Sequence, residues 1–542
     1  MCQDIILGNI VDVVKRKIFP GEITLSEGLI YSIKHLSEAP DVFIIPGLID
    51  AHVHIESSML VPSEFAKAAV RHGTVAVVSD PHEIANVLGV NGVLFMLENA
   101  KKTNFKFFFG APSCVPATQY ETAGARIGLH KIEDLLGRED IFLLSEIMNY
   151  PDVIRGDNVV KKKIKIAKGK RKVIDGHAPG LRGEDLKKYI SAGISTDHEC
   201  LSMEEALEKL ENGMKVIIRE GSAAKNSDVL FELIDKYPGG VMLCTDDIHP
   251  DDLENGHIDN IIRRGISKGL NLFNILRAAT INPVTHYKID CGSLQQGDKG
   301  DLIIVDSLKD FNILATYIEG KKVFDGKKIL LDDVGIEKIN HFVAKEIYSD
   351  DLTIQAGSVL VKIIEARDGS LVTGKSIMPM TGINGSLVTD PEKDILKISV
   401  LNRYQKTSPS LGFIKGFGLK KGAIAGSVAH DSHNIIAIGA NDKDLKTAIN
   451  KVIQLKGGLV VAEDSRIDCL ELPVAGLMSD RDVFSVAKEY RNLLKRSKEL
   501  GSKLTSAFMT MSFMTLLVIP ELKISDKGLF DTAEFRITSL YA

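Results

Sequence analysis

Two histidines separated by one residue, His52 and His54, stand at the end of a short apolar run. Side chains alternate faces along a strand, so both imidazoles should point the same way, with Val53 on the opposite side. Paired imidazoles suit a borderline-soft divalent metal such as Zn, Mn or Fe. Two surface histidines bonded to water or to the backbone are the alternative, and the rest of the chain has to decide.

Further titratable residues follow other apolar runs at the same relative position. They are Asp80, His82 and Glu83, then Glu146, then His177, then Asp197, His198 and Glu199, and finally Asp246 and Asp247. With the first pair, they place five of the 14 histidines at strand ends. Imidazoles and carboxylates gathered in this way indicate a two-metal site, in which a carboxylate bridges cations about 3.5–4 Å apart.

The elements that must position these residues are eight buried strands, each followed by a helical stretch. The strands are predicted at 43–55, 74–80, 105–113, 141–149, 172–180, 193–199, 215–222 and 240–247. Apolar strands that alternate with helices indicate a parallel sheet covered on both faces. Eight units in about 240 residues match an α/β fold of the (β/α)8 TIM barrel type, whose active site lies at the carboxyl ends of the strands. An open doubly wound sheet is the alternative, but no GxGxxG follows the first strand.

Two further regions flank this predicted barrel, which we assign to residues 43–290. Residues 1–42 and 291–339 both contain short strands punctuated by Gly and Asp, and together they predict one split β domain. Residues 340–542 predict a separate C-terminal α+β domain, with an amphipathic helix over 480–504.

Charge and cysteine content exclude several classes of protein. The 67 basic and 72 acidic residues give a net charge of −5, which offers no footprint for nucleic acid or an anionic membrane. The six cysteines, at positions 2, 114, 200, 244, 291 and 469, form no CxxC pair and are expected to be reduced, mostly packed thiols.

The first residues lack a secretion signal, and the apolar stretch 508–520 is shorter than the ~20 residues that span a bilayer. We therefore expect a cytoplasmic protein.

Several motifs together resemble the metal-dependent amidohydrolase superfamily. They are PGLIDAHVH, the carboxylate on the fourth strand, single histidines on the fifth and sixth, TDD on the eighth, and the return strand GDKGDLIIVD. A narrower set resembles the bacterial-type adenine deaminases over nearly the whole chain: IDAHVHIESSML, VVSDPHEIANVLG, DGHAPGL, CTDDIHPDDL and LPVAGLMSD. This resemblance implies hydrolysis of adenine to hypoxanthine and ammonia in purine salvage, by attack of a metal-bridging hydroxide at C6.

The resemblance also implies a set of metal ligands. They are His52 and His54 on the first ion, His177 and His198 on the second, Glu146 as the bridge, and Asp246 on the first ion. Glu146 stands where many relatives have a carboxylated lysine, and a carboxylate can bridge two ions directly. We expect two divalent ions per chain, and the resemblance favours manganese. Iron and zinc are alternatives, because imidazole and carboxylate ligands without thiolate suit all three.

Three carboxylates are the predicted catalytic residues. The resemblance makes Asp246 the proton carrier, with the adjacent Asp247 as the alternative. Attack at C6 also loads charge onto N1 of the ring, which must gain a proton there. Glu83 and Glu199 are both placed to supply it, and the sequence does not choose between them.

Weaker evidence predicts substrate contacts at His82, Asp80, Arg219, Ser222 and Asp247. The first two belong to DPHE, where Asp80 capping a helix, with Glu83 imitating a capping box, is the alternative. A salt bridge at the rim explains Arg219 nearly as well.

A late segment, GSVAHDSHN at 426–434, carries His430, Asp431 and His433. We expect a polar loop after a strand. A metal site is one alternative, and a loop that covers the barrel mouth and excludes water is another. There is no PCxxC motif, which argues against the other zinc deaminase design.

Two rival functions remain open. A cyclic-amide hydrolase, dihydropyrimidinase-like or deacetylase-like, would use the same scaffold, and because fold does not fix the pocket, adenine rests on the resemblance. A catalytically dead scaffold would be expected to have lost ligands, whereas all six positions are filled. We expect a homo-oligomer, with a dimer as the commonest state.

Overall fold

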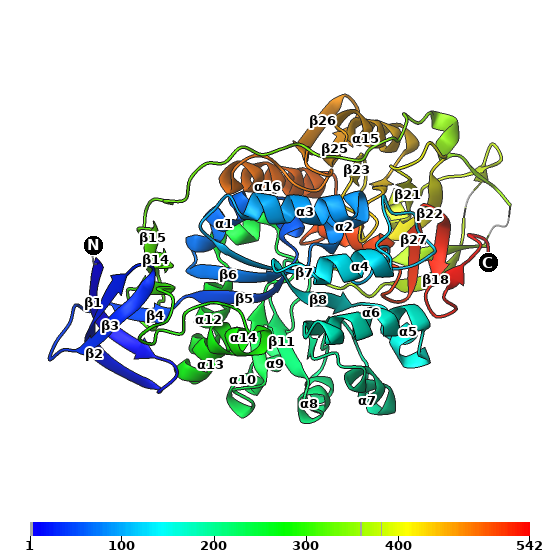
Figure 1. The fold of residues 1–542 in the computed structure, drawn as a ribbon. Coiled ribbons are helices and arrows are strands. Elements are labelled where there is room, and N and C mark those ends of the chain that lie inside the picture. Colours follow the sequence, from blue (N-terminus) through cyan, green and yellow to red (C-terminus); the bar gives the residue numbers. More distant parts are fainter. Residues whose placement is uncertain (1–3, 358–359, 381) are drawn as a thin grey trace.

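The computed structural model describes residues 4–357, 360–380 and 382–542. It has a mixed α/β fold in which N-terminal strands lie at one end and the last strands of the chain at the other (Figure 1). Strands alternating with helices lie between these ends. Among the described residues, no helix combines the length and the apolar character that crossing a membrane requires.

The central strands form two parallel sheets. The first contains β5 (Leu48–Val53), β6 (Thr74–Ser79), β7 (Lys106–Ala111), β8 (Ile141–Ile147) and β9 (Val173–Gly176) in that order. The second contains β10 (Thr196–Asp197), β11 (Lys215–Arg219) and β12 (Val241–Cys244). Each of the eight predicted strands overlaps one of these, and most of them are apolar runs that are buried on both faces.

Backbone hydrogen bonds link the two sheets at both edges. Between β9 and β10, Ser195 N donates to the carbonyl oxygen of Ile174 at 3.0 Å. Between β5 and β12, His54 N donates to Asp246 O at 3.1 Å, and Asp246 N donates to His52 O at 2.9 Å. The second link joins two of the strand ends predicted to carry the site.

Helices follow the strands along the chain. They are α1 (Pro62–Val70), α2 (His82–Leu88), α3 (Val90–Ala100), α4 (Leu129–Leu136), α5 (Tyr150–Arg155), α6 (Asn158–Gly169), α7 (Gly183–Ser191), α8 (Met203–Glu211), α9 (Ser227–Leu230), α10 (Glu232–Lys236), α11 (Pro250–Asn255), α12 (Ile258–Ser267), α13 (Leu272–Ala279) and α14 (Ile281–Tyr287). They surround the strands in Figure 1.

The prediction of one strand over 43–55 is wrong, because two strands occupy this stretch. β4 (Phe43–Pro46) pairs with strands at the N-terminal end of the molecule, whereas β5 joins the central sheet. Gly47 separates them, and a Cβ there would lie 2.5 Å from both methyl carbons of Val75. A side chain at position 47 would therefore clash with Val75, and only glycine lets the chain pass from one sheet to the other here.

Two distant segments share one seven-stranded sheet. Its order is β15 (Lys321–Phe324), β14 (Ile313–Ile318), β13 (Leu302–Val305), β4, β1 (Asp4–Asp12), β2 (Lys17–Ser26) and β3 (Leu29–His35). β4 pairs in parallel with β1 and antiparallel with β13, so it joins the N-terminal strands to those after the central region.

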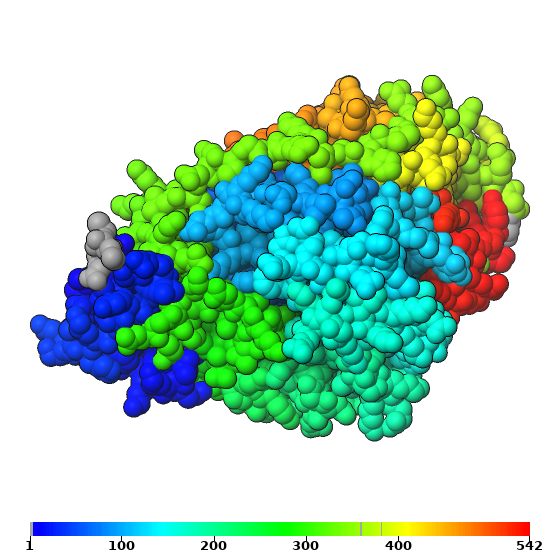
Figure 2. Space-filling model, viewed as in Figure 1, coloured from blue at the N-terminus to red at the C-terminus, as the bar shows by residue number. Residues whose placement is uncertain are grey.

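A long segment without helix or strand follows β15 and runs over the outside of the blue helices (Figure 2). Lys102, beside α3, donates to the carbonyl oxygen of Gly335 at 2.9 Å and anchors this segment.

The last third of the chain is built on an eight-stranded sheet. Its order is β18 (Gly374–Pro379), β17 (Leu360–Glu365), β22 (Ser410–Lys415), β21 (Leu396–Leu401), β24 (Ile435–Gly439), β23 (Ala423–Gly426), β25 (Gly458–Glu463) and β26 (Arg466–Glu471). Smaller sheets contain β16 (Ile354–Gln355), β19 (Gly382–Ile383) and β20 (Ser386–Leu387), and β27 (Leu522–Ser525), β28 (Gly528–Asp531) and β29 (Arg536–Ile537).

Three helices accompany these strands: α15 (Asp442–Leu455), α16 (Val483–Glu499) and α17 (Ala507–Ser512). α16 lies within the predicted helix 480–504 and begins where the Asp482 carboxylate accepts hydrogen bonds from the amides of Phe484 and Ser485, each at 3.0 Å. It packs against α1 and α11, which brings the C-terminal part of the chain onto the central helices.

The cysteines among the described residues are all free thiols. Cys200, Cys244 and Cys291 are buried, whereas Cys114 and Cys469 are partly exposed. Cys2 lies outside the described residues.

Candidate active site

The ends of the central strands bring all six predicted metal ligands into one buried cluster. On one side, Asp246 Oδ1 lies 3.1 Å from His54 Nε2 and 3.4 Å from His52 Nε2. On the other, Glu146 Oε2 lies 3.0 Å from His177 Nδ1 and 3.3 Å from His198 Nε2. Glu146 Oε1 lies 3.5 Å from His54 Nε2, so this carboxylate stands between the two groups of imidazoles.

The alternation of β5 accounts for the first pair. His52 and His54 turn to the same side, and their Nε2 atoms are 3.3 Å apart. His54 Nδ1 lies 3.0 Å from the carbonyl oxygen of Asp80, to which only an N–H can donate. This contact fixes the tautomer and leaves the lone pair of Nε2 facing the cluster, which is the arrangement that a metal-binding histidine needs.

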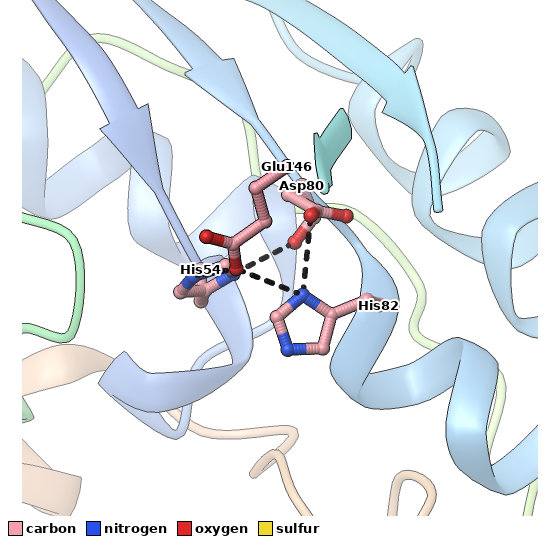
Figure 3. Close-up of side chains that lie close together, drawn as sticks. All are labelled: His54, Asp80, His82 and Glu146. Carbon is pink, nitrogen blue, oxygen red and sulfur yellow. Dashed lines mark hydrogen bonds and ion pairs between the residues drawn. The ribbon is translucent and has the colours of Figure 1, made fainter. Parts of the chain in front are cut away.

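Asp80 and His82 also point into the cluster (Figure 3). His82 Nδ1 lies 3.2 Å from Asp80 Oδ2 and 3.6 Å from Glu146 Oε1. The N-cap of α2 is Pro81, and the side chain that accepts from the first turn is Glu56, whose Oε1 lies 3.1 Å from the amide of Ile84. The alternative in which Asp80 caps the helix is therefore wrong.

Two buried polar atoms of this cluster lack a hydrogen-bond partner among the described residues. They are Oδ1 of Asp80 and Nε2 of His177, whereas Oδ2 of Asp80 and Nδ1 of His82 face each other in an ion pair at 3.2 Å. Buried polar atoms in proteins are almost always paired. Orphaned nitrogen and oxygen atoms at the edge of a histidine–carboxylate cluster fit a bound cation.

Arg219 and Glu199 extend the cluster from β11 and from the residues after β10. Arg219 Nη1 contacts Asp246 Oδ2 and lies 2.5 Å from Glu199 Oε1. Burial alone would raise the pKa of Asp246, but the Arg219 guanidinium and the His198 imidazole hold it well below its usual range. Arg219 is only 5% exposed, so it belongs to the buried cluster and not to an exposed rim.

The neighbouring predictions, Asp247 and Ser222, differ in outcome. Asp247 borders the cavity, and its Oδ1 accepts a hydrogen bond from Ser57 Oγ at 2.5 Å. Burial and the charge of Asp246 raise the pKa of Asp247. Ser222 instead donates to Asp252 Oδ2 at 2.5 Å and accepts from His249 N. The hydroxyl is therefore turned toward the start of α11, and Ser222 is not among the residues that line the cavity.

The loop before β24 reaches the cluster, whereas the sequence predicts an ordinary polar loop after a strand. His430 Nδ1 lies 2.6 Å from Glu83 Oε1, and His433 Nε2 contacts Glu83 Oε2. Burial alone would raise the pKa of Glu83, but His430 and His433 hold it well below its usual range. The preference for a polar loop without a site contact is therefore wrong.

A small cavity lies over the strand ends. Besides the titratable residues it is lined by Met148, Leu371, Phe513 and Leu516. The last three belong to the C-terminal part of the chain, and reasoning from the sequence had not included them. Their apolar character carries no chemical signal, so only the folded chain identifies them.

Comparisons with known proteins agree with this geometry. The model of the amidohydrolase family matches residues 43–323, and that of the adenine deaminase C-terminal domain matches residues 370–536. The chain is 52% identical to the adenine deaminase of Methanosarcina acetivorans, with 99% of each chain covered. It is 53% identical to that of Sulfurovum sp., covering 97% of this chain and 98% of the relative. The chain belongs to the adenine deaminase family.

An adenine deaminase of lower identity matches over a similar length. The Borreliella burgdorferi protein is 46% identical, covering 97% of this chain and 98% of that one. Among solved structures, a β-aspartyl dipeptidase from Fervidobacterium islandicum is 17% identical with a TM-score of 0.46, covering 62% of this chain and 100% of that one.

Membership of the amidohydrolase family implies that the protein uses a divalent metal ion. The imidazole and carboxylate groups at the strand ends form a set of donors that fits such an ion. Three overlapping groups have ligand atoms within 4.8 Å of one another: His52, His54 and Asp246; His52, Glu146 and His198; and His54, Asp80, His82 and Glu146. All are buried and none contains a thiolate. Such imidazole and carboxylate donors suit Mn, Fe or Zn.

Proposed function

We propose that this protein hydrolyses adenine to hypoxanthine and ammonia, a reaction of purine salvage. The observation that carries the proposal is the convergence of four imidazoles and two carboxylates on one buried cluster. Full-length similarity to adenine deaminases supports adenine as the substrate.

The fold proposed for this reaction is a closed (β/α)8 TIM barrel. The backbone hydrogen bonds that join β9 to β10 and β5 to β12 support closure of the two central sheets into one barrel. The domains would be residues 43–290 for the barrel, 1–42 plus 291–339 for a split β domain, and 340–542 for a C-terminal α+β domain. The seven-stranded sheet, which combines strands from both flanking segments, supports the split domain.

Two ions per chain are proposed, with manganese first and iron or zinc as alternatives. His52, His54 and Asp246 would hold the first ion, His177 and His198 the second, and Glu146 would bridge them. When bound, divalent ions lower the pKa of a shared water so that hydroxide is available near neutral pH.

Asp246 is proposed to carry the proton. Its Oδ1 faces the histidines, while Oδ2 is held by Arg219, so the carboxylate is oriented and kept ionised. An ionised carboxylate can accept the proton of the water that adds to C6. It then returns this proton to the amino group that leaves C6 as ammonia.

Glu199 is the better-supported donor to N1 of the ring. Its contacts within the described part of the chain all use Oε1, which lies near Arg219, His177 and His198. Oε2 is therefore available to a substrate. Both oxygens of Glu83, in contrast, contact histidines of the C-terminal loop. Glu199 would protonate N1, and its carboxylate would take up the proton of the new C6 hydroxyl as hypoxanthine forms.

Phe513, Leu516 and Leu371 are proposed to exclude bulk water from the reaction. They line the cavity on the side of the C-terminal region, and an apolar cover strengthens the electrostatic contacts beneath it.

The test supplies adenine, dihydrouracil and an N-acetylated amino sugar phosphate to the metal-loaded protein, each in a separate assay. We expect ammonia and hypoxanthine to be released from adenine in equal amounts, with no hydrolysis of the other two. Hydrolysis of either amide by a metal-loaded protein that leaves adenine unchanged would overturn the proposal in favour of the cyclic-amide or deacetylase alternative.

A further inference from the structure

A second group of ligand-type side chains lies beside the strand-end cluster. It consists of His82 and Glu83 at the start of α2, and His430, Asp431 and His433 of the loop before β24. Every one of these residues is at most 4% exposed. Three imidazoles and two carboxylates thus converge where α2 meets the C-terminal part of the chain.

The spacing of the donor atoms suits a single ion. His82 Nε2 lies 3.4 Å from Glu83 Oε1 and 3.8 Å from Asp431 Oδ1, and the ligand atoms of these three residues all lie within 4.8 Å of one another. His430 Nδ1 lies 3.9 Å from Asp431 Oδ1. Metal–ligand bonds of about 2.1 Å in a tetrahedral site set neighbouring donor atoms ~3.4 Å apart, which is close to these distances.

Two contacts are shorter than a metal site requires. Glu83 Oε1 and His430 Nδ1 are 2.6 Å apart, so one of them must move by about 0.8 Å to reach the ~3.4 Å spacing of two ligands. Without an ion this pair is a charge-assisted hydrogen bond, and that is the competing explanation of the cluster. Glu83 Oε2 also contacts His433 Nε2, so the carboxylate must turn away from both histidines for the cluster to take an ion.

An unpaired atom distinguishes this cluster from a closed hydrogen-bond network. Asp431 Oδ2 is buried and has no hydrogen-bond partner among the residues with described positions. A network that existed only to join α2 to the loop would be expected to satisfy its members. A carboxylate that keeps a bare oxygen in such a site is typical of a cation ligand.

The loop is held in place by contacts that do not use the donor atoms. Ser432 Oγ donates to Glu121 Oε2 at 2.7 Å, and Tyr404 OH donates to the carbonyl oxygen of Ser432 at 2.6 Å. Thr515 Oγ1 donates to the carbonyl oxygen of His430 at 2.8 Å. The backbone that presents the histidines is thus fixed independently, as preorganised metal ligands require.

We propose that this cluster binds a third divalent metal ion, separate from the pair at the strand ends. Glu83 and His82 supply ligands from α2, and His430, Asp431 and His433 supply them from the loop. With several imidazoles and no thiolate, the site suits Zn, Mn or Fe and not Ca or Mg, which take oxygen ligands. The ion cross-links two segments about 350 residues apart in sequence and holds the loop over the cavity.

The experiment locates and counts ions in the full-length protein. Protein stripped with a chelator is reloaded with Mn²⁺, freed of excess metal and analysed for manganese, and its crystals are measured at the manganese absorption edge. We expect three ions per chain and an anomalous peak between His82, Glu83 and Asp431. Full occupancy at the strand ends with no peak at this position would overturn the inference.

Variants separate this site from the proposed reaction centre. His433→Gln and Asp431→Asn are expected to lose one ion per chain, whereas the matched control His286→Gln, a partly buried histidine of α14, keeps all three. Glu146→Gln is expected to lose strand-end metal and to retain the third peak. Three ions in both loop variants would contradict the third site, whereas a wild-type protein that binds the third ion but no metal at the strand ends would contradict only the proposed function.

Discussion

The ammonium group of Lys209 lies 2.7 Å from Oδ2 of Asp197, and both side chains are fully buried. Oδ1 of the same carboxylate accepts a hydrogen bond from the amide of Ala178 at 2.8 Å, and Lys209 donates to the Ala178 carbonyl oxygen at 2.8 Å. Ala178 follows His177, and Asp197 precedes His198. This buried ion pair therefore positions both proposed ligands of the second metal.

Breaking the pair from one side should destabilise the protein strongly. Lys209→Met leaves the Asp197 carboxylate buried without its partner, and we expect a loss of about 3–5 kcal/mol in the free energy of unfolding. Urea unfolding of the metal-free protein measures it. Glu205 also contacts Lys209, at 2.6 Å, so the double variant with Asp197→Leu still leaves one buried carboxylate unpaired and should recover only part of the loss. A single variant as stable as the wild type would contradict the role assigned to the pair.

Asp246 and Asp247 should differ sharply when each is replaced by asparagine. Asp246→Asn removes the proposed proton carrier, so we expect kcat to fall by about 10²–10⁴-fold. Asp247→Asn weakens one hydrogen bond with Ser57, so kcat should fall by about tenfold or less. Steady-state assays with adenine, run with metal analysis of both variants, make the comparison. A larger loss in Asp247→Asn would exchange the two roles.

Glu199 and Glu83 should separate in their effect on the chemical step. Glu199→Gln removes the proposed donor to N1, and kcat should fall by about 10²–10⁴-fold with one limb of the pH–rate profile lost. Glu83→Gln should keep both limbs, because its carboxylate contacts the loop histidines. If the limb disappears in Glu83→Gln and persists in Glu199→Gln, Glu83 is the donor.

Lys523 should make stability depend on pH. Burial lowers its pKa to about 7. Nζ donates to the carbonyl oxygens of Leu371 and Phe513, and these two residues line the cavity. Between pH 7 and ~10.4, the usual lysine value, the unfolded chain binds this proton and the folded chain does not. The free energy of unfolding should therefore rise with pH, by at most about 1.4 kcal/mol per unit.

Lys523→Met should remove this contribution. The difference between the unfolding curves of wild type and variant, measured from pH 7 to 9, isolates it from other groups. Lys321→Met, which replaces an exposed lysine of β15, serves as the control and should keep the wild-type slope. Equal slopes in all three proteins would show that Lys523 stays protonated in the folded state.

The sequence predicted most of the central strands because they are continuous apolar runs that end in a polar residue, whereas β10 is only Thr196 and Asp197. His52 and His54 could be assigned to one face because the alternation of a strand is local. The division of residues 43–55 into two strands at Gly47 could not be predicted. The close approach of Val75 that requires glycine there is visible only in the folded chain.

The loop of His430 and His433 could not be placed from the sequence. Its contact with Glu83 joins residues 350 positions apart, and nothing in the local pattern says which strand end it meets. For the same reason Phe513 and Leu516 carried no signal, because an apolar side chain that covers a cavity looks like any other core residue.

The most direct test of the account concerns Glu146, which stands between the two groups of histidines. Wild type and Glu146→Gln are stripped of metal and reloaded with increasing Mn²⁺, and ammonia release from adenine is measured against bound metal. We predict that wild-type activity rises with metal occupancy of the strand ends. The Glu146→Gln variant should remain folded but lose both the strand-end metal and the activity. Full activity in the metal-free protein, or in a Glu146→Gln variant without strand-end metal, would contradict the proposed mechanism.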